Sequence, residues 1–259
     1  QAAAAGGFTR VVTMANTNPV VDNAALVRGL KKQAELTGVV KVEFIGAVSK
    51  GLEGKELAEM GDMAEAGVVA FSDDGHYVEN AAFMRRALEY SSMFNKMVID
   101  HAEDITLTKN GHMHEGIVSY ELGVIGRPAV AEDLAVARDI LLSEMTGGHI
   151  HIAHVSSKNT VDMVRRAKAK GLNVTCEVTS QHLSFTDEYL REYNPAFKMA
   201  PPIRSEDHRQ ALLEGLKDGT IDAIITDHAP HAYEEKDHEF CCAPNGFSGL
   251  ETSLAAVIT

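Results

Sequence analysis

The stretch His149-Ile-His-Ile-Ala-His-Val-Ser156 shows the local pattern that decides the fold of this chain. It is a short apolar run rich in β-branched residues, which is typical of a buried strand in a parallel sheet. The run ends at His154, and the polar turn Val155-Ser-Ser157 follows it. The stretch therefore predicts a strand that carries a chemically active side chain at its carboxyl end.

The same pattern recurs along the sequence. Seven runs are predicted to be strands: Arg10 to Met14, Val40 to Val48, Val68 to Phe71, Met97 to Ile99, His149 to Val155, Asn173 to Val178 and Ile221 to Thr226. The segments between them have helical spacing of apolar residues, and several stop at a glycine, such as Gly38, Gly67 or Gly171. Alternating strands and helices predict right-handed βαβ units around a parallel sheet.

The positions of polar residues distinguish a closed barrel from an open sheet, which periodicity alone cannot do. Polar side chains lie at or just past the carboxyl ends of the predicted strands, namely Asn16, Asp73, Asp74, His101, His154, His182 and Asp227. In a (β/α)8 TIM-type barrel these ends converge on one mouth. We therefore expect an α/β barrel, and a single domain over residues 1–259, because that length allows one large core.

Composition excludes several classes of function. The formal net charge of −13 argues against a surface that binds nucleic acid, which needs clustered Lys and Arg. Three cysteines without CxxC spacing fit a reduced cytosol better than a disulfide framework. No run approaches the roughly 18 apolar residues of a membrane span. We expect a cytoplasmic protein without membrane or nucleic-acid partners.

Four strand ends supply residues suited to a metal. His101 ends one predicted strand, His154 another, and Asp74 and Asp227 follow two more. Two imidazoles and two carboxylates match the ligand preference of zinc or a similar divalent ion. Such an ion makes water nucleophilic at neutral pH, and a neighbouring carboxylate can move a proton. The pattern predicts a hydrolase.

The other histidines have less specific interpretations. His112 and His114 form an HxH pair but are expected in a glycine-flanked loop, which is a poor support for a metal. His149 and His151 share one side of a strand and lie below its end, so we expect core residues. A further set, His76, His208 and His238, is expected to face solvent.

Several ordered motifs give the chain a family resemblance. They are Met14-Ala-Asn-Thr-Asn-Pro19, Phe71-Ser-Asp-Asp-Gly75, Asp100-His-Ala-Glu103, His151-Ile-Ala-His-Val-Ser156, Cys176-Glu-Val-Thr179, Pro201-Pro-Ile-Arg204, Asp227-His-Ala-Pro-His231 and Gly249-Leu-Glu-Thr252. In these motifs the whole chain resembles the class I dihydroorotases of the amidohydrolase superfamily.

The resemblance implies a metal-dependent (β/α)8 barrel whose first strand is missing from this chain. Its ligand order places Asp74, His101, His154 and Asp227 in the last four positions, after an upstream HxH pair that this sequence does not contain. Asp74 rather than Asp73 is chosen as bridging ligand from its separation to His101 in that pattern. We accordingly expect a fragment of a longer chain, shortened at both ends.

The resemblance also implies roles in substrate binding and catalysis. Asn16 and His231 are expected to contact the substrate carboxylate, and the loop from Pro244 to Gly246 is expected to clamp the ring. Asp227 is expected to be both metal ligand and proton shuttle.

The implied activity is reversible hydrolysis of dihydroorotate to carbamoyl aspartate, with one or two zinc ions, in a homodimer. Aspartate transcarbamoylase is a candidate partner. A hydantoinase, dihydropyrimidinase or allantoinase is the nearest alternative, but those relatives usually bridge their metals with a modified lysine, and residues 71–75 contain none. A non-catalytic scaffold for aspartate transcarbamoylase is the other alternative.

Three positions depart from the family pattern. They are Ala15, where Pro is frequent, Ser180-Gln181 before His182, and Ala200 before Pro201. None of them removes an expected ligand.

Overall fold

The structure is a computed structural model that describes residues 1–258. The chain forms two compact units, and each is built from several segments. Unit 1 contains residues 1–102, 138–153 and 167–175, and unit 2 contains residues 103–137, 154–166 and 176 onward. No helix among residues 1–258 combines the length and apolar character needed to cross a bilayer.

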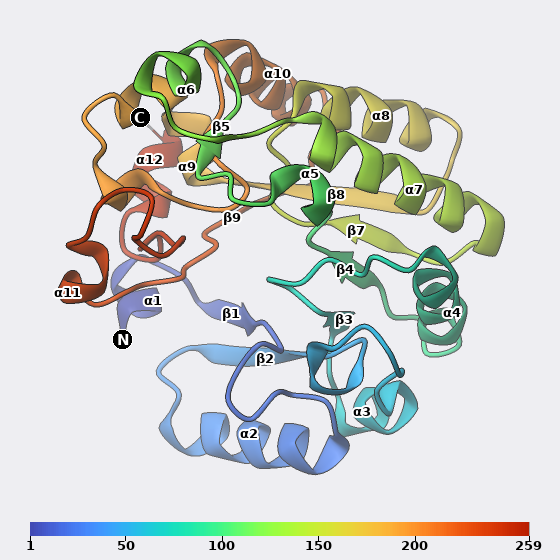
Figure 1. The fold of residues 1–259 in the computed structure, drawn as a ribbon. Coiled ribbons are helices and arrows are strands. Elements are labelled where there is room, and N and C mark those ends of the chain that lie inside the picture. The colour runs from blue at the N-terminus through green and yellow to red at the C-terminus, as the bar shows by residue number, and fades with distance from the viewer. Residues whose placement is uncertain (259) are drawn as a thin grey trace. The chain divides into compact units, whose positions relative to one another are not determined.

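Unit 1 is built on parallel strands with helices between them (Figure 1). Its strands pair in the order β1 (Arg10–Thr13), β2 (Lys41–Gly46), β3 (Ala70–Ser72), β4 (Val98–Asp100) and β7 (Ile150–Ile152). Its helices are α1 (Ala2–Ala5), α2 (Ala24–Thr37), the short 3-10 helix η1 (Lys50–Leu52), α3 (Met60–Ala66) and α4 (Ala81–Ser92). Five of the predicted strands are thereby confirmed.

Helix boundaries in unit 1 follow local chemistry. The Asn23 side chain accepts the Leu26 N–H at 3.0 Å at the start of α2, and the Asn80 side chain caps α4 in the same way. This satisfies N–H groups that have no partner inside the helix. Helix α3 ends at Gly67, whose φ of 93° is readily adopted by glycine.

Unit 2 contains two parallel strand pairs. Strand β8 (Val174–Thr179), whose first two residues belong to unit 1, pairs with β9 (Ala223–Ile225), and β5 (Met113–His114) pairs with β6 (Gly126–Arg127). The remaining two predicted strands are thereby confirmed. Its helices are α5 (Ile105–Thr108), α6 (Ile117–Leu122), α9 (Ser180–Ser184), η2 (Asp187–Leu190), η3 (Pro195–Phe197), α10 (Glu206–Lys217), α11 (Tyr233–Lys236) and α12 (Ser253–Ile258). Helices α7 (Val130–Thr146) and α8 (Lys158–Ala169) begin in unit 2 and end in unit 1.

One local expectation was wrong. The segment around His112 and His114 was expected to be a loop, but Met113 and His114 form β5 and pair with Gly126 and Arg127. The pairing partner lies beyond α6, so no local periodicity could indicate it.

Buried apolar side chains anchor the strands that carry the candidate site. In unit 1, Ile45, Ala70, Ile99 and Ala153 form one buried cluster. Each comes from or directly follows a different parallel strand, and burying an isoleucine contributes about 1.5–3 kcal/mol. The residues that follow these strands therefore start from well-fixed backbone positions.

Candidate metal centre

Asp74 and His101 meet because they follow neighbouring parallel strands. Strands β3 and β4 pair with Ser72 opposite Ile99, so each ligand candidate lies two residues beyond the last paired position. The His101 Nδ1 atom lies 3.8 Å from Asp74 Oδ1, and the two side chains are only 12% and 13% exposed. The pairing register therefore brings a carboxylate and an imidazole together in a shielded position.

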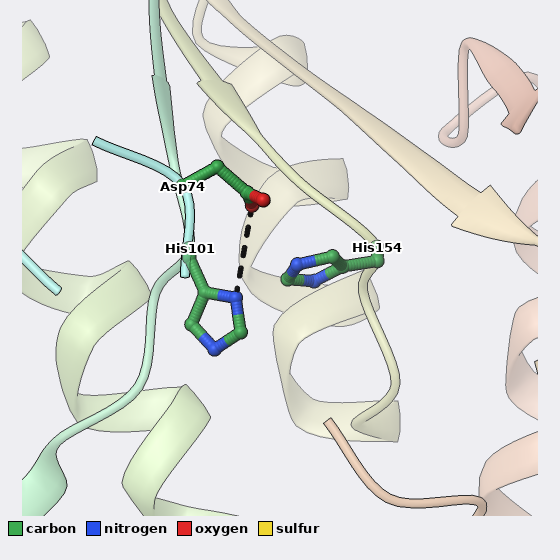
Figure 2. Close-up of side chains that lie close together, drawn as sticks. All are labelled: Asp74, His101 and His154. Carbon is green, nitrogen blue, oxygen red and sulfur yellow. Dashed lines mark ion pairs between the residues drawn. The ribbon is translucent and has the colours of Figure 1, made fainter. Parts of the chain in front are cut away.

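His154 joins this pair from the end of β7. The Ala153 N–H donates to the Asp100 carbonyl at 3.1 Å, which fixes the residue that precedes His154 beside the residue that precedes His101. One ligand atom from each of Asp74, His101 and His154 lies within 4.8 Å of the others, and Figure 2 shows the three side chains facing one another. Two imidazole nitrogens and a carboxylate oxygen are a donor set that zinc accepts.

The backbone at His154 is unusual for a residue with a side chain. Its φ is 34°, and Asp227 has a φ of 41°. Positive φ values are costly for non-glycine residues and tend to occur where a site requires them. Both residues were expected from the sequence to be metal ligands, so this strain marks the same two strand ends.

Asp227 follows β9 in unit 2 and is half-buried. Among residues 1–258, the group of potential ligands contains Asp74, His101 and His154 and does not include Asp227. Its assignment as fourth ligand and proton shuttle stays a prediction.

The two adjacent aspartates, Asp73 and Asp74, have different contacts in the structure. Asp73 is buried, and its Oδ1 accepts the N–H groups of Val48 and Ser49 at 2.8 and 3.0 Å, while its Oδ2 accepts the Ser49 hydroxyl. Burial raises the pKa of Asp73, and these hydrogen bonds oppose the rise. The Asp73 carboxylate holds the turn after β2, which leaves Asp74 as the one that faces His101.

A half-buried arginine supports the Asp74 and His101 side of the site. Arg138 in α7 donates to Asp139 and, at 3.3 Å, to Asp100 Oδ2, next to His101. The same guanidinium donates to the Val78 carbonyl, in the loop that follows Asp74. Arg138 therefore ties together the chain segments that carry both residues.

A second arginine, which is buried, supports the turn after His154. The Glu132 carboxylate accepts the N–H groups of Ser156 and Ser157 at 3.0 and 2.9 Å, and also the Ser156 hydroxyl. Arg204 lies 3.4 Å from Glu132 and donates to Ser156 Oγ at 2.7 Å. Burial would raise the pKa of Glu132, but Arg204 and these hydrogen bonds outweigh it and lower the pKa.

The substrate-contact candidates fall in both units. His231, Pro244 and Gly246 lie in unit 2, where His231 Nε2 is 2.8 Å from the Asn245 carbonyl. A Cβ on Gly246 would lie 2.7 Å from the His231 ring, so this loop packs directly on that imidazole. Asn16 is exposed in unit 1, and its side chain lies beside Gly75, directly after Asp74.

Three further histidines, His149, His151 and His208, have structural roles. His149 Nε2 and His151 Nδ1 both bond the Thr175 hydroxyl, at 2.8 and 2.7 Å, which confirms their placement on one side of the strand. His208 was expected to face solvent, which is wrong. It is buried, accepts the Lys158 N–H at 2.9 Å and stacks edge-on against His114. His208 has polar neighbours in the sequence, which gave no indication that it lies on the buried face of α10.

The predictions for two other histidines are confirmed. His76 and His238 are exposed, as expected. Burial and the neighbouring Arg204 lower the pKa of His114 to about 3, so this imidazole is neutral at pH 7.

Sequence reasoning missed several charged side chains that the fold buries or half-buries. Glu132 and Arg138 look like ordinary charges on a long helix, and Lys198 and Lys236 like loop lysines. A usable signal was the density of acids in α7, where Glu132, Asp133 and Asp139 all face inward. Buried acids are rare unless they have partners.

Comparison with known protein families and sequences adds an independent line of evidence. The model of the family described as dihydro-orotase-like matches residues 1–160. A dihydroorotase of Pelotomaculum thermopropionicum is 54% identical over 259 residues, which cover 100% of this chain and 60% of that protein. A dihydroorotase of Syntrophus aciditrophicus is 51% identical over 259 residues, covering 100% of this chain and 61% of that one. The chain thus spans about 60% of the length of these relatives.

Solved structures give the fold. An L-hydantoinase (dihydropyrimidinase) from Arthrobacter aurescens superposes with a TM-score of 0.85 and 27% identity, covering 100% of this chain and 59% of that one. A D-hydantoinase superposes with a TM-score of 0.79 and 21% identity, again over 100% of this chain and 59% of that one. The predicted α/β fold, that of the amidohydrolase barrels, is confirmed.

Proposed function

The chain belongs to the dihydro-orotase-like family, and from this premise we propose that its protein is a dihydroorotase. The reaction would be the reversible hydrolysis of (S)-dihydroorotate to N-carbamoyl-L-aspartate in pyrimidine biosynthesis. The observation that carries the proposal is about 50% identity to dihydroorotases along the whole chain, with the Asp74, His101 and His154 group inside the matched segment.

A divalent ion fits the residues present, and we propose zinc, as one or two ions. Asp74, His101 and His154 would hold it, with Asp227 as a further ligand from β9. Such an ion supplies Lewis acidity for the amide carbonyl and a nucleophile from water near neutral pH. Asp227 would accept a proton from the attacking water and pass it to the departing ring nitrogen.

Substrate recognition is assigned to residues at the ends of β1 and β9. Asn16 and His231 would bind the substrate carboxylate, and the segment from Pro244 to Gly246 would contact the ring. The packing of Gly246 on His231 supports a common role for these two residues. In the synthetic direction the same groups would close carbamoyl aspartate into the ring.

The residue type at position 74 favours this reaction over the nearest alternative, because the Asp74 carboxylate would hold the metal directly. A hydantoinase or allantoinase would be expected to place a modified lysine in residues 71–75, and Asp74 lies there instead, facing His101. A non-catalytic scaffold for aspartate transcarbamoylase would have no use for the shielded group of Asp74, His101 and His154. We further propose a cytoplasmic homodimer, with aspartate transcarbamoylase as a possible partner, and one amidohydrolase domain over residues 1–259.

The test is hydrolysis of dihydroorotate by the full-length protein loaded with zinc, with hydantoin and allantoin as control substrates. Turnover of dihydroorotate alone supports the proposal, and turnover of a control substrate moves the protein to the sister activity. Metal binding without any turnover would favour the scaffold. The Asp227→Asn variant should retain some metal yet lose nearly all turnover, and wild-type rates in this variant would refute its role as proton shuttle.

A further inference from the structure

Two lysines in unit 2 are each bonded to three backbone carbonyls. Lys198 is 4% exposed, and its Nζ donates to the carbonyls of Phe240, Cys241 and Ala243 at 2.8, 3.1 and 2.7 Å. These three short bonds match in number the three N–H donors of an ammonium group. The Lys198 ammonium is therefore a cap on the backbone of residues 240–243.

Lys236 repeats the arrangement from the end of α11. Its Nζ donates to the carbonyls of Pro195, Lys198 and Pro244 at 2.9, 3.1 and 3.0 Å. The Lys198 carbonyl also accepts the Gly246 N–H at 3.0 Å. The two lysines and Gly246 thus form one connected network around residues 240–246.

The clamped segment has little regular structure of its own. Within residues 237–246 there is no helix or strand, and the main internal bonds run from the Cys242 and Ala243 N–H groups to the Glu239 carbonyl. Buried carbonyls without partners would be costly, because each loses its bonds to water. The lysine ammonium groups supply the missing donors.

The contacts of the two lysines fit a structural role better than a chemical one. Among residues 1–258, neither lysine forms an ion pair with a carboxylate, and the only side chain within hydrogen-bond distance of Lys198 Nζ is His112, at 3.4 Å. Burial lowers the pKa of both lysines. A catalytic lysine would need its nitrogen directed at a substrate, whereas both of these are occupied by backbone.

The segment held by the lysines is the one that contacts His231. A Cβ on Gly246 would lie 2.4 Å from the Ala229 carbonyl and 2.7 Å from the His231 ring, so only glycine allows this close approach. The Asn245 carbonyl lies 2.8 Å from His231 Nε2 and orients the imidazole. Displacing residues 240–246 would therefore release His231 as well.

We infer that Lys198 and Lys236 are positioning residues, whose ammonium groups hold residues 240–246 against His231 before substrate binds. The part that concerns substrate rests on the proposed function, in which His231 and Gly246 contact dihydroorotate. Ordering a loop in advance removes an entropic cost from binding. Loss of the bonds should therefore weaken substrate binding more than it slows chemistry.

The test uses Lys198→Met and Lys236→Met in the full-length protein, since methionine has similar length but no N–H donors. Lys109→Met, an exposed lysine in the same unit, is the matched control. Amide hydrogen exchange should accelerate at least ~10-fold at Cys242, Ala243 and Gly246 in both variants, because these amides sit in the held segment. Exchange in β4 and β7 and in the control should be unchanged.

Steady-state kinetics give the second readout. The KM for dihydroorotate should rise about 10-fold while kcat changes less than about threefold, the pattern expected for lost ground-state binding. Unchanged exchange in Lys198→Met, or in Lys236→Met if the first variant does not fold, overturns the inference. Faster exchange with unchanged KM overturns the link to substrate. If the wild type does not hydrolyse dihydroorotate, the proposed function fails while the exchange result still decides whether the lysines hold the loop.

Discussion

Two arginines, the half-buried Arg138 and the buried Arg204, support the candidate ligands, and they differ in how many acids surround them. In unit 1, Arg138 is shared by two buried carboxylates, Asp100 and Asp139. In unit 2, Arg204 faces a single buried carboxylate, Glu132. The first cluster has more acid than cation, whereas the second is balanced.

The difference in charge balance decides the direction of each pKa. Burial raises the pKa of Asp139 more than Arg138 and its hydrogen bonds lower it. Burial, with the neighbouring Asp139 carboxylate adding to it, raises the pKa of Asp100 well above its ordinary value although Arg138 opposes the rise. For Glu132, burial acts in the same direction but is outweighed by Arg204 and three hydrogen bonds, so the pKa is lowered. A buried ion pair thus behaves as a fixed charge only when it is fully matched.

Breaking the balanced pair of Arg204 and Glu132 should cause the largest loss in the free energy of unfolding. Glu132→Gln leaves Arg204 buried without its counter-ion and replaces one of the two carboxylate oxygens that accept from the Ser156 turn with an NH2 group. We therefore expect a loss of about 3–5 kcal/mol in the free energy of unfolding. Urea denaturation of the full-length protein measures it. Glu144→Gln, an exposed α7 residue 3.9 Å from Lys170, is the control and should cost less than ~1 kcal/mol. Equal effects in the two variants would mean that Arg204 and Glu132 are not a matched pair.

The stability of the Glu132→Gln variant relative to the wild type should depend on pH. Because the pKa of Glu132 is lowered on folding, its stabilisation is present above the ordinary value of 4.5 and is lost as the pH falls through the folded value. The stability gap between wild type and Glu132→Gln should therefore narrow between pH 7 and pH 3. Denaturation midpoints at pH 7, 5, 4 and 3 provide the check, and a gap that widens toward acid would reverse the assigned sign.

Removing an acid from the acid-rich cluster of Arg138, Asp100 and Asp139 should change the free energy of unfolding only slightly, and any change should be a gain. Asp139→Asn removes one surplus negative charge while its amide oxygen can still accept from Arg138. We expect the free energy of unfolding at pH 7 to change by less than about 1 kcal/mol, with any gain largest above the ordinary pKa of 3.8. Urea denaturation at pH 7 and pH 4 tests this. A loss above ~2 kcal/mol at pH 7 would mean that Asp139 is a fully charged partner.

Much of this architecture could be predicted because strands and their ends are local features. The runs that became β1 to β4 and β7 to β9 each carry their own pattern of β-branched residues, and parallel pairing then brings Asp74 and His101 together. The β5 and β6 ladder and the buried face of His208 were missed because both depend on contacts between segments distant in sequence. The same holds for Lys198, whose carbonyl partners lie more than 40 residues away.

The most direct test of the account is zinc binding to the protein with one ligand altered. Equilibrium titration of the metal-free full-length protein should show tight binding, and His154→Asn should weaken it by at least ~10-fold, as expected for loss of a direct ligand rather than of a supporting residue. The control is His151→Asn, which alters a buried histidine of β7 that bonds Thr175 in β8, and it should bind zinc like the wild type. If His154→Asn binds zinc as tightly as the wild type, or if both variants lose it equally, the group of Asp74, His101 and His154 is not the metal centre.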